Sequence, residues 1–346
     1  MPFVTKYGTY FGLPPAALGR IHFVAPADSY TVDGRSYSAS DDNDGLSPER
    51  ALRTIAQADT NITASAGEVI FLLPGTHSPA ATVRLAKAGI TIAGARSPFT
   101  SDASVSRALG AHGLPSKVSF ATAAAPGFSI EADNIEICFV ELQPASGFGA
   151  VYFRNSNPDA LYMHDFVINL AAGQAISLDT AGVDFGYRAD TAGLATRSMS
   201  RLAQTTQRAT AFLADFSIIG GGAHGPGILT ATADVHVRNG RLHNRAGAWA
   251  SPFVIATGTG YIYVSASHWS AQTVTGIGTC VDGTTAGTIN GKVFLADCRF
   301  PARHPGINSQ VDNFVAGVAQ LVECYGGNNN PTFGDHATMY QVLSSV

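Results

Sequence analysis

The residues best suited to acid–base chemistry in this 346-residue sequence lie together in the stretch LADCRFPARH. A carboxylate, two guanidinium groups and an imidazole so close together could bind a substrate and transfer protons. A second column of acidic residues, which metal-assisted chemistry would need, is not visible beside them. The sequence therefore predicts no catalytic site, and the candidates that remain are Asp297, Arg299, Arg303 and His304.

A second group of polar residues, DDNDG at positions 41–45, contains oxygen ligands of the kind that Ca²⁺ prefers. The glutamate that would close an EF-hand loop is missing, and a loop that only enters the first coil is the alternative. The histidines show no HxH or HxxxH spacing and the cysteines show no CxxC pair, so a zinc site is not indicated. The sequence predicts no metal or other cofactor, and the candidates are Asp41, Asp42 and Asp44.

Aromatic residues form two candidate binding surfaces. Tyr261 and Tyr263 share one face of an alternating strand, opposite Val264, so we expect them to face outward. Outward aromatic residues contact glycans or neighbouring subunits, and packing under a loop is the alternative. Near the N-terminus, four aromatic residues precede a Leu-Pro-Pro stretch, and we expect this arm to dock on a neighbouring protein. They are Phe3, Tyr7, Tyr10 and Phe11.

A repeating scaffold must position these residues, because one pattern recurs along the chain. It reads apolar, any, apolar, two residues, then apolar or small, any, and usually apolar. The intervals between copies are 26, 50, 24, 27, 31 and 26 residues, and the value of 50 indicates one coil that is hidden or replaced. A period near 25 with short alternating strands predicts a parallel β-helix. The seven copies begin at Ile135, Leu161, Ala211, Val235, Ile262, Val293 and Ala319.

The two-residue break inside each copy predicts a sharp corner between two strands. Its second position is Asp, Asn or Glu in five copies, and Asp and Asn tolerate the left-handed backbone. The corner shifts the alternation, so apolar residues on both of its sides face inward. Cys298 and Cys324 fall in one slot a coil apart, where a disulfide and two stacked thiols are both open. The five corner residues are Asp165, Asp215, Asn239, Asp297 and Glu323.

The regions outside the repeat complete a single solenoid. Ser47 followed by Pro48 predicts a capping helix near 48–59 that covers the open first coil. The period breaks at 179–208, where we expect an irregular insertion that carries a binding face. The chain thus divides into an extended anchoring arm (1–21), the β-helix (22–326) and a C-terminal cap or tail (327–346).

The N-terminal motifs resemble the entry of pectate-lyase-like right-handed parallel β-helix proteins. The similarity runs from Phe23-Val24 through SASDDNDGLSPERALRTI to GEVIFLLPGTHS and GITIAG, and the period extends it to about residue 326. The resemblance implies an all-β fold, a single-stranded right-handed solenoid with an N-terminal capping helix. The superfamily includes lyases, hydrolases, epimerases, phage tailspikes and capsid-surface proteins, so the resemblance does not select an activity.

Two enzymatic motifs of that superfamily are incomplete here. Its lyases carry Arg-x-Pro-x-x-Arg, whereas the spacing from Arg299 to Arg303 is one residue short. Its polygalacturonase-like hydrolases carry Gly-His-Gly with paired carboxylates, whereas only Asp215 lies near the glycine-rich stretch around His224. A tailspike depolymerase, either a lyase or a hydrolase, therefore stays open as the alternative function, and enzymatic activity is left undecided with a non-enzyme favoured.

Composition narrows the possible partners. Charged residues make up 13% of the chain, against roughly 25% in ordinary soluble domains, and the net charge is −4 without any Lys/Arg run. Nucleic acid is therefore not expected as a partner. No apolar stretch is long enough to span a bilayer, and the start does not have the pattern of a secretory signal. A neutral surface suits contact with copies of the chain itself.

These expectations favour a structural protein of a phage virion. It would be a decoration, cementing or spike protein on the capsid surface, would assemble as a homotrimer, and would bind neighbouring capsid subunits and host glycans. A bacterial surface adhesin is a further alternative.

Overall fold

The structure described here is a computed structural model of the full chain. It describes residues 19–32, 34–95, 116–121, 123, 126–145, 148–153, 161–170, 176–178, 210–221, 228–230, 234–246, 254–256, 262–271, 281–282, 292–298, 311–312, 318–322 and 339–342. Strands dominate these residues, with one short α-helix and one 3₁₀ turn.

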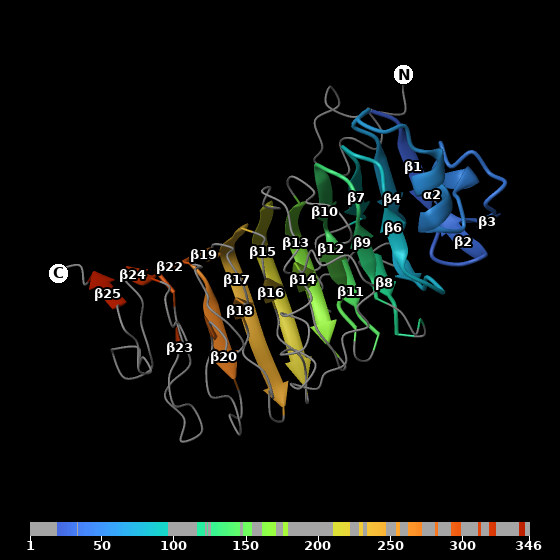
Figure 1. The fold of residues 1–346 in the computed structure, drawn as a ribbon. Helices are drawn as coiled ribbons and strands as arrows, with labels where there is room; N and C mark the ends of the chain where they lie inside the picture. The colour runs from blue at the N-terminus through green and yellow to red at the C-terminus, as the bar shows by residue number, and fades with distance from the viewer. Residues whose placement is uncertain are drawn as a thin grey trace.

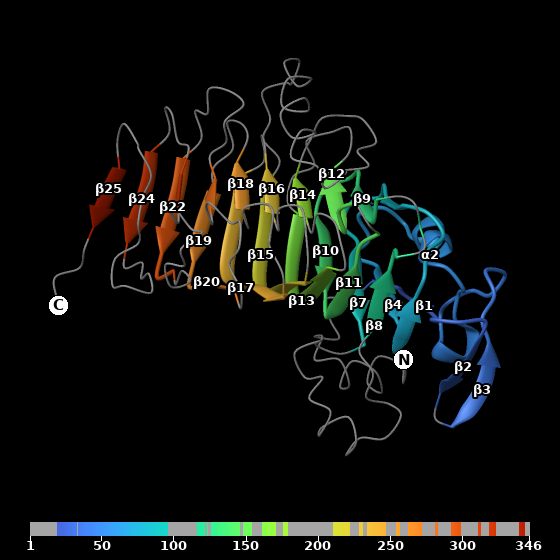
Figure 2. The ribbon, with the colours of Figure 1, turned by 90° about the horizontal axis from the view of Figure 1, so that it is seen from below.

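Two parallel sheets run side by side along the molecule (Figures 1 and 2). The path of the larger, 15-stranded sheet is β1 (Ile21–Val24), β4 (Val69–Leu72), β7 (Thr91–Gly94), β10 (Ile135–Cys138), β13 (Leu161–Leu170), β15 (Thr210–Gly221), β17 (Asp234–Ala246), β19 (Ile262–Ser265), β22 (Lys292–Ala296), β24 (Val318–Val322) and β25 (Met339–Val342). Its side strands are β5 (Gly75–His77), β8 (Ser116–Ser119), β11 (Val140–Gln143) and β20 (His268–Ala271).

The second sheet has eight strands and the third is a small hairpin. In spatial order the eight strands are β23 (Val311–Asp312), β21 (Val281–Asp282), β18 (Val254–Ala256), β16 (Ile228–Thr230), β14 (Ile176–Leu178), β12 (Val151–Phe153), β9 (Phe128–Ile130) and β6 (Val83–Leu85). The hairpin pairs β2 (Ser29–Val32) with β3 (Arg35–Ser38) in antiparallel register. All strand pairs of the two large sheets are parallel in the described part of the chain, which makes the fold all-β and compatible with a β-solenoid.

The register confirms the repeat. All seven expected starting residues pair in sequence, from Ile135 opposite Leu161 through to Val293 opposite Ala319. Two positions further along each strand, a column of apolar side chains faces the interior between the two sheets. Its buried members are Ile70, Ile92, Ile137, Met163, Leu213, Val237, Val264 and Leu295.

Of the two alternatives for the interval from 161 to 211, a hidden coil or a replaced one, the hidden coil is wrong. Strand β13 pairs directly with β15 over most of its length, so one coil spans the whole 50-residue interval. The parallel step from β14 to β16 on the second sheet agrees with this. The interval is long because the connection between the two strands is long, and the expected insertion at 179–208 lies outside the described residues.

The corners have the expected left-handed backbone. Asp165, Asp215, Asn239 and Asp297 all have φ near +50°, which confirms four of the five expected corner residues. Asn239 also donates a hydrogen bond to the Asp215 carboxylate at 2.7 Å, which links successive corners. The fifth, Glu323, lies outside the described residues.

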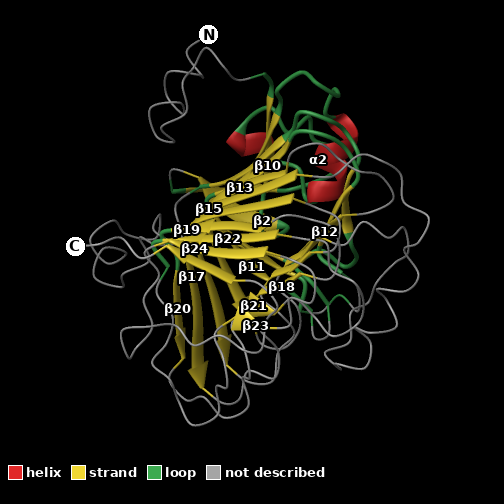
Figure 3. Ribbon diagram, turned by 60° about the vertical axis from the view of Figure 1, so that its left-hand side comes forward, coloured by secondary structure: helices red, strands yellow, loops and turns green. Residues whose placement is uncertain are grey.

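The N-terminal helix begins later than its sequence signal indicates. Ser47 makes no side-chain cap, and Pro48–Arg50 form only a 3₁₀ turn. The α-helix α2 (Ile55–Asn61) begins after Thr54, whose hydroxyl accepts a hydrogen bond from the backbone N–H of Gln57. Ser-Pro at a chain reversal suits a tight turn as well as a helix start, so the expected start at 48 is wrong, whereas the end at Asn61 lies close to the expected 59. Figure 3 shows α2 beside one end of the stacked strands.

Helix α2 packs into the core that the sheets share. Its buried residues Ile55 and Ala58 belong to the same hydrophobic cluster as Leu72 of β4 and Leu85 of β6. Asp41 holds the start of the helix, because its carboxylate accepts hydrogen bonds from the backbone N–H groups of Arg53 and Thr54 and from the Thr54 hydroxyl.

In the inward column that follows the corner residues, a large side chain on one strand leaves space for only a small residue on the next. The rings of Phe166 and Phe216 stack at 4.9 Å, and Gly240 follows in the same column. A Cβ on Gly240 would lie 2.6 Å from the Phe216 ring. Gly240 is therefore required by the space left beside the ring, rather than by its backbone conformation.

We predict that Gly240→Ala lowers the free energy of unfolding by about 1–3 kcal/mol, because it overpacks this column. Chemical denaturation followed by circular dichroism measures the effect. In a Phe216→Leu background the same substitution should cost clearly less, since the clashing ring is gone. An equal cost in both backgrounds would show that the clash is not the cause.

Candidate functional site

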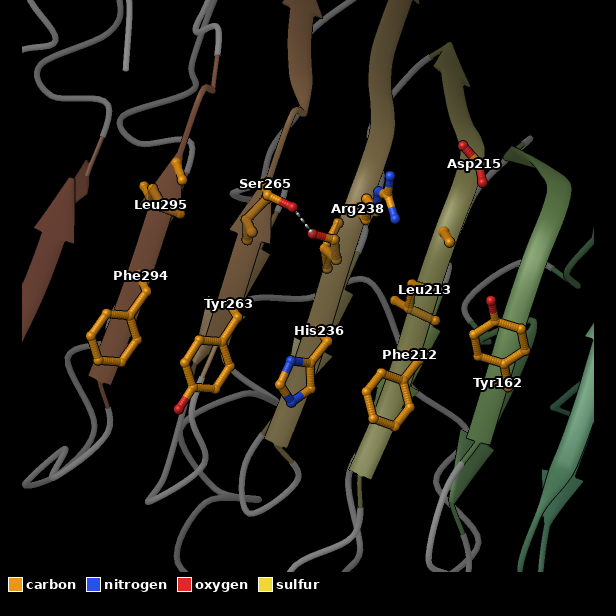
Figure 4. Close-up of a pocket in the computed structure, with 14 residues that line it drawn as sticks. Tyr162, Phe212, Leu213, Asp215, His236, Arg238, Tyr263, Ser265, Phe294 and Leu295 are labelled. Carbon is orange, nitrogen blue, oxygen red and sulfur yellow. Dashed lines mark hydrogen bonds between the residues drawn. The ribbon is translucent and has the colours of Figure 1, made fainter. Parts of the chain in front are cut away.

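The outer face of the long sheet carries a column of aromatic rings. Each ring sits one residue before an inward apolar residue, so strand alternation turns it outward. The pairing register aligns these positions on five consecutive strands. We call this column the ring ladder; its members are Tyr162, Phe212, His236, Tyr263 and Phe294 (Figure 4).

The rings of the ladder stack on one another at the spacing of the strands. The ring centroids of Phe212, His236, Tyr263 and Phe294 follow at 4.8, 4.6 and 4.9 Å, and their planes deviate by 19° or less. Tyr162 is different, because its ring is tilted by 56° against Phe212. At the N-terminal end of the ladder, the side chains of Tyr162 and Phe212 are 43% and 37% exposed.

A groove of about 590 Å³ runs along the ladder. Beside the rings, its wall contains Arg238 and Ser265 from the next outward column, and Asp215 from the corner (Figure 4). Apolar walls with a few polar groups are typical of ligand sites. The groove therefore has the composition of a binding site and extends along the stack instead of into the core.

The structure changes the expectation for Tyr263. Its side chain is half-buried and opposite the buried Val264, so it faces outward as expected. Both faces of its ring are covered, however, by His236 and Phe294. A sugar cannot stack on a covered face, so Tyr263 offers only its edge and hydroxyl. Tyr261 lies outside the described residues.

At the N-terminal end of the ladder, four ionisable residues meet. Glu136 and Cys138 lie on β10, His164 lies opposite Cys138 on β13, and Asp165 follows at the corner. The imidazole of His164 lies between two carboxylates, with Nε2 at 3.0 Å from Glu136 Oε1 and Nδ1 at 2.9 Å from Asp165 Oδ2. We call these four residues the His164 cluster. The rings of Phe139 and Tyr162 pack against the imidazole.

The environment of the cluster favours an imidazolium between two carboxylates. Hydrogen bonds to Cys138, Glu136 and Asp165 raise the pKa of His164 well above its usual value, against the effect of burial. The hydrogen bond from His164 in turn lowers the pKa of Glu136. Burial raises the pKa of the Cys138 thiol, which is 1% exposed. A buried, protonated thiol is a poor nucleophile, so the cluster does not have the features of a cysteine-dependent active site.

Of the four catalytic candidates, the structure describes only Asp297. Asp297 occupies its corner with φ of 49° and an exposed side chain, as the corner hypothesis requires. Arg299, Arg303 and His304 lie outside the described residues, as do Cys324 and the arm residues Phe3, Tyr7, Tyr10 and Phe11.

The acidic loop uses its carboxylates on the protein itself. Asp41 binds the start of α2, Asp44 accepts a hydrogen bond from the N–H of Leu46 and pairs with Arg50, and Asp42 lies within 3.4 Å of the Ser40 hydroxyl. These contacts support the alternative of a structural loop over a calcium site. Among the described residues, the group of three potential metal ligands that does converge is Glu136, Cys138 and His164.

The sequence contains a signal for this cluster that the search for local motifs missed. Cys138 and His164 are 26 residues apart, which is one coil, so the repeat itself places them side by side. His164 is half-buried between two carboxylates.

Comparisons with protein-family models, with curated proteins and with solved structures found no match. Within the described residues, no helix is long and apolar enough to cross a membrane. The class that these observations define is an all-β protein of stacked parallel strands, with a ring ladder and a cluster of ionisable residues on one outer face.

His77 allows a test of how burial affects a titratable side chain in the core. His77 is buried at the end of β5, and its Nε2 lies 2.8 Å from the Leu73 carbonyl oxygen, to which the neutral ring donates. Burial lowers the pKa of His77 to about 4, below its unfolded value of 6.5. Above pH 6.5 the ring is neutral in both the folded and the unfolded chain. As the pH falls from 6.5 toward 4, the unfolded chain takes up a proton that the folded chain does not, so the free energy of unfolding decreases.

We predict that wild type loses up to about 3 kcal/mol of stability between pH 7 and pH 4 relative to His77→Gln, which keeps a donor but cannot titrate. Urea unfolding of both proteins at each pH measures the difference, and the comparison cancels titrations that the two proteins share. Parallel pH profiles would contradict a neutral, buried His77.

Proposed function

We propose that this chain is a structural protein of a bacteriophage virion, a decoration, cementing or spike protein whose groove binds host-surface glycan. Its body is a single-stranded right-handed parallel β-helix in which α2 covers the open first coil. The N-terminal arm anchors it on neighbouring capsid subunits, and three copies assemble. The observation that carries the proposal is the groove beside the ring ladder, together with the resemblance of the N-terminal motifs.

The stacked body supports a structural role. Eleven strands follow one another along the long sheet, and among the described residues one hydrophobic cluster extends from Val24 to Cys298. Such a solenoid is stabilised by contacts between neighbouring coils along its whole length, and it offers a long surface to partners. The low charge of the chain suits contact with further copies, because little charge must be desolvated.

The shape and chemistry of the groove support glycan binding. Five strands at a spacing of about 4.8 Å give it a length of about 20 Å, which suits a linear saccharide. Asp215 and Ser265 can accept hydrogen bonds from sugar hydroxyls, and Arg238 can donate to them. The tilted ring of Tyr162 lies at the end of the ladder, where one neighbouring strand carries Glu136 in place of a ring.

We predict that the purified chain is a trimer in solution. Light scattering coupled to size-exclusion chromatography measures its mass directly. A chain that stays monomeric at micromolar concentration would contradict the assembly that we propose, while leaving glycan binding to be measured separately.

We predict that Tyr162→Ala and Arg238→Ala each weaken binding of a host-surface polysaccharide by about 10-fold, which corresponds to about 1.4 kcal/mol. Affinity electrophoresis on gels that contain the polysaccharide measures the change. Arg84→Ala removes an exposed arginine that pairs with Glu131 away from the groove, and it should leave binding unchanged.

Two outcomes would contradict this assignment. If wild type is not retarded by any neutral or acidic polysaccharide of the panel, the groove does not bind glycan. If the chain instead releases unsaturated products from uronate polymers, detected by their absorbance, it is a lyase and the non-enzymatic assignment is wrong.

A further inference from the structure

We propose that Glu136, Cys138 and His164 form a binding site for a divalent transition metal ion, and that zinc fits it best. The three side chains offer a carboxylate oxygen, a sulfur and an imidazole nitrogen, all within 4.8 Å of one another. A thiolate with an imidazole selects zinc and its neighbours in the periodic table, whereas calcium and magnesium prefer oxygen alone. The inference does not depend on glycan binding.

The backbone already places the three donors for coordination. Cys138 and His164 are directly opposed on neighbouring parallel strands, and Glu136 lies two residues before Cys138 on the same outward face. Zinc bonds of about 2.0–2.3 Å separate tetrahedral ligand atoms by about 3.4–3.7 Å. Oε1 of Glu136 and Nε2 of His164 are already 3.0 Å apart, and all three donors lie within 4.8 Å of one another. Small rotations of the partly exposed side chains of Glu136 and His164 can bring the donors to this spacing.

Two further residues hold the ligands in the orientation that a metal requires. Asp165 accepts from Nδ1 of His164, which leaves Nε2 directed at Glu136. Thr91 donates its hydroxyl to Oε2 of Glu136 at 2.7 Å, which leaves Oε1 for the metal. Carboxylates on the far nitrogen of a ligating histidine are a regular feature of metal sites. Three protein ligands leave one position of a tetrahedral zinc ion for water or another small ligand.

The charges of the cluster are compatible with binding. Zinc ligands are deprotonated, so binding one Zn²⁺ would release the proton of the Cys138 thiol, and any proton on Nε2 of His164, to solvent. Zn²⁺ together with the Cys138 thiolate and the carboxylates of Glu136 and Asp165 would then give the site a net charge of −1.

Cobalt(II) tests the site in the full-length chain, because it substitutes for zinc and is coloured. Under a non-chelating reductant, we expect one Co²⁺ per chain with the intense visible bands of tetrahedral coordination and a thiolate-to-cobalt charge-transfer band. Added Zn²⁺ should abolish both. Cys138→Ser should remove the charge-transfer band, whereas Cys298→Ser, which alters another buried cysteine just after β22, should retain it.

Asp165→Asn tests the positioning role without altering a ligand. Asn tolerates the φ of 50° at this corner and keeps the shape of the side chain, so the fold should be unchanged. We expect Zn²⁺ affinity, measured by competition with a chromophoric chelator, to fall about 10- to 100-fold. Asp215→Asn changes the same corner one coil away, where Ala214 stands in place of the histidine, and it should have no effect.

Circular dichroism of each variant separates loss of the site from loss of the fold. If Cys138→Ser unfolds, Glu136→Gln is the second ligand variant. Glu136→Gln should keep the charge-transfer band and bind Co²⁺ more weakly. The proposal is overturned if wild type shows no charge-transfer band. It is also overturned if folded Cys138→Ser or, in its place, folded Glu136→Gln binds Co²⁺ with the spectrum and affinity of wild type.

Discussion

Each feature of this protein depends on the parallel register that puts equivalent residues of successive coils next to each other. Strands in such a sheet lie about 4.8 Å apart, so a side chain meets its counterpart in the next coil at nearly van der Waals distance. Inward columns become a continuous core, corners fall into one line, and outward columns become ladders. A residue can therefore be understood only together with its neighbours one period before and after.

The same constraint explains which side chains the outer columns tolerate. Like charges stacked at this spacing repel, whereas aromatic rings stack with an energy of their own. The ring ladder follows this rule, and the low charge of the whole chain is consistent with it. The His164 cluster satisfies it in another way, because an imidazole lies between two carboxylates and separates them. In the inward columns, Gly240 beside Phe216 shows the corresponding limit on volume.

The parts of the fold that were predicted from sequence are those that the period encodes. The seven strand starts and four of the corners follow from spacing, and from the tolerance of Asp and Asn for the left-handed backbone. The errors arose where the spacing carries no information about local structure. The long connection between β13 and β15 was interpreted as containing a hidden coil. Ser47-Pro48 was interpreted as a helix start, although a tight turn uses the same residues.

Sequence alone determined the column to which each residue belongs, since alternation and period depend only on counting along the chain. Tertiary structure decided which members of a column touch and with which atoms. Stacking covered both faces of Tyr263, and long-range pairing brought Glu136, Cys138 and His164 within reach of a common ion. Side-chain rotation and the burial of each coil by its neighbours set those contacts, and neither is contained in a local stretch of sequence.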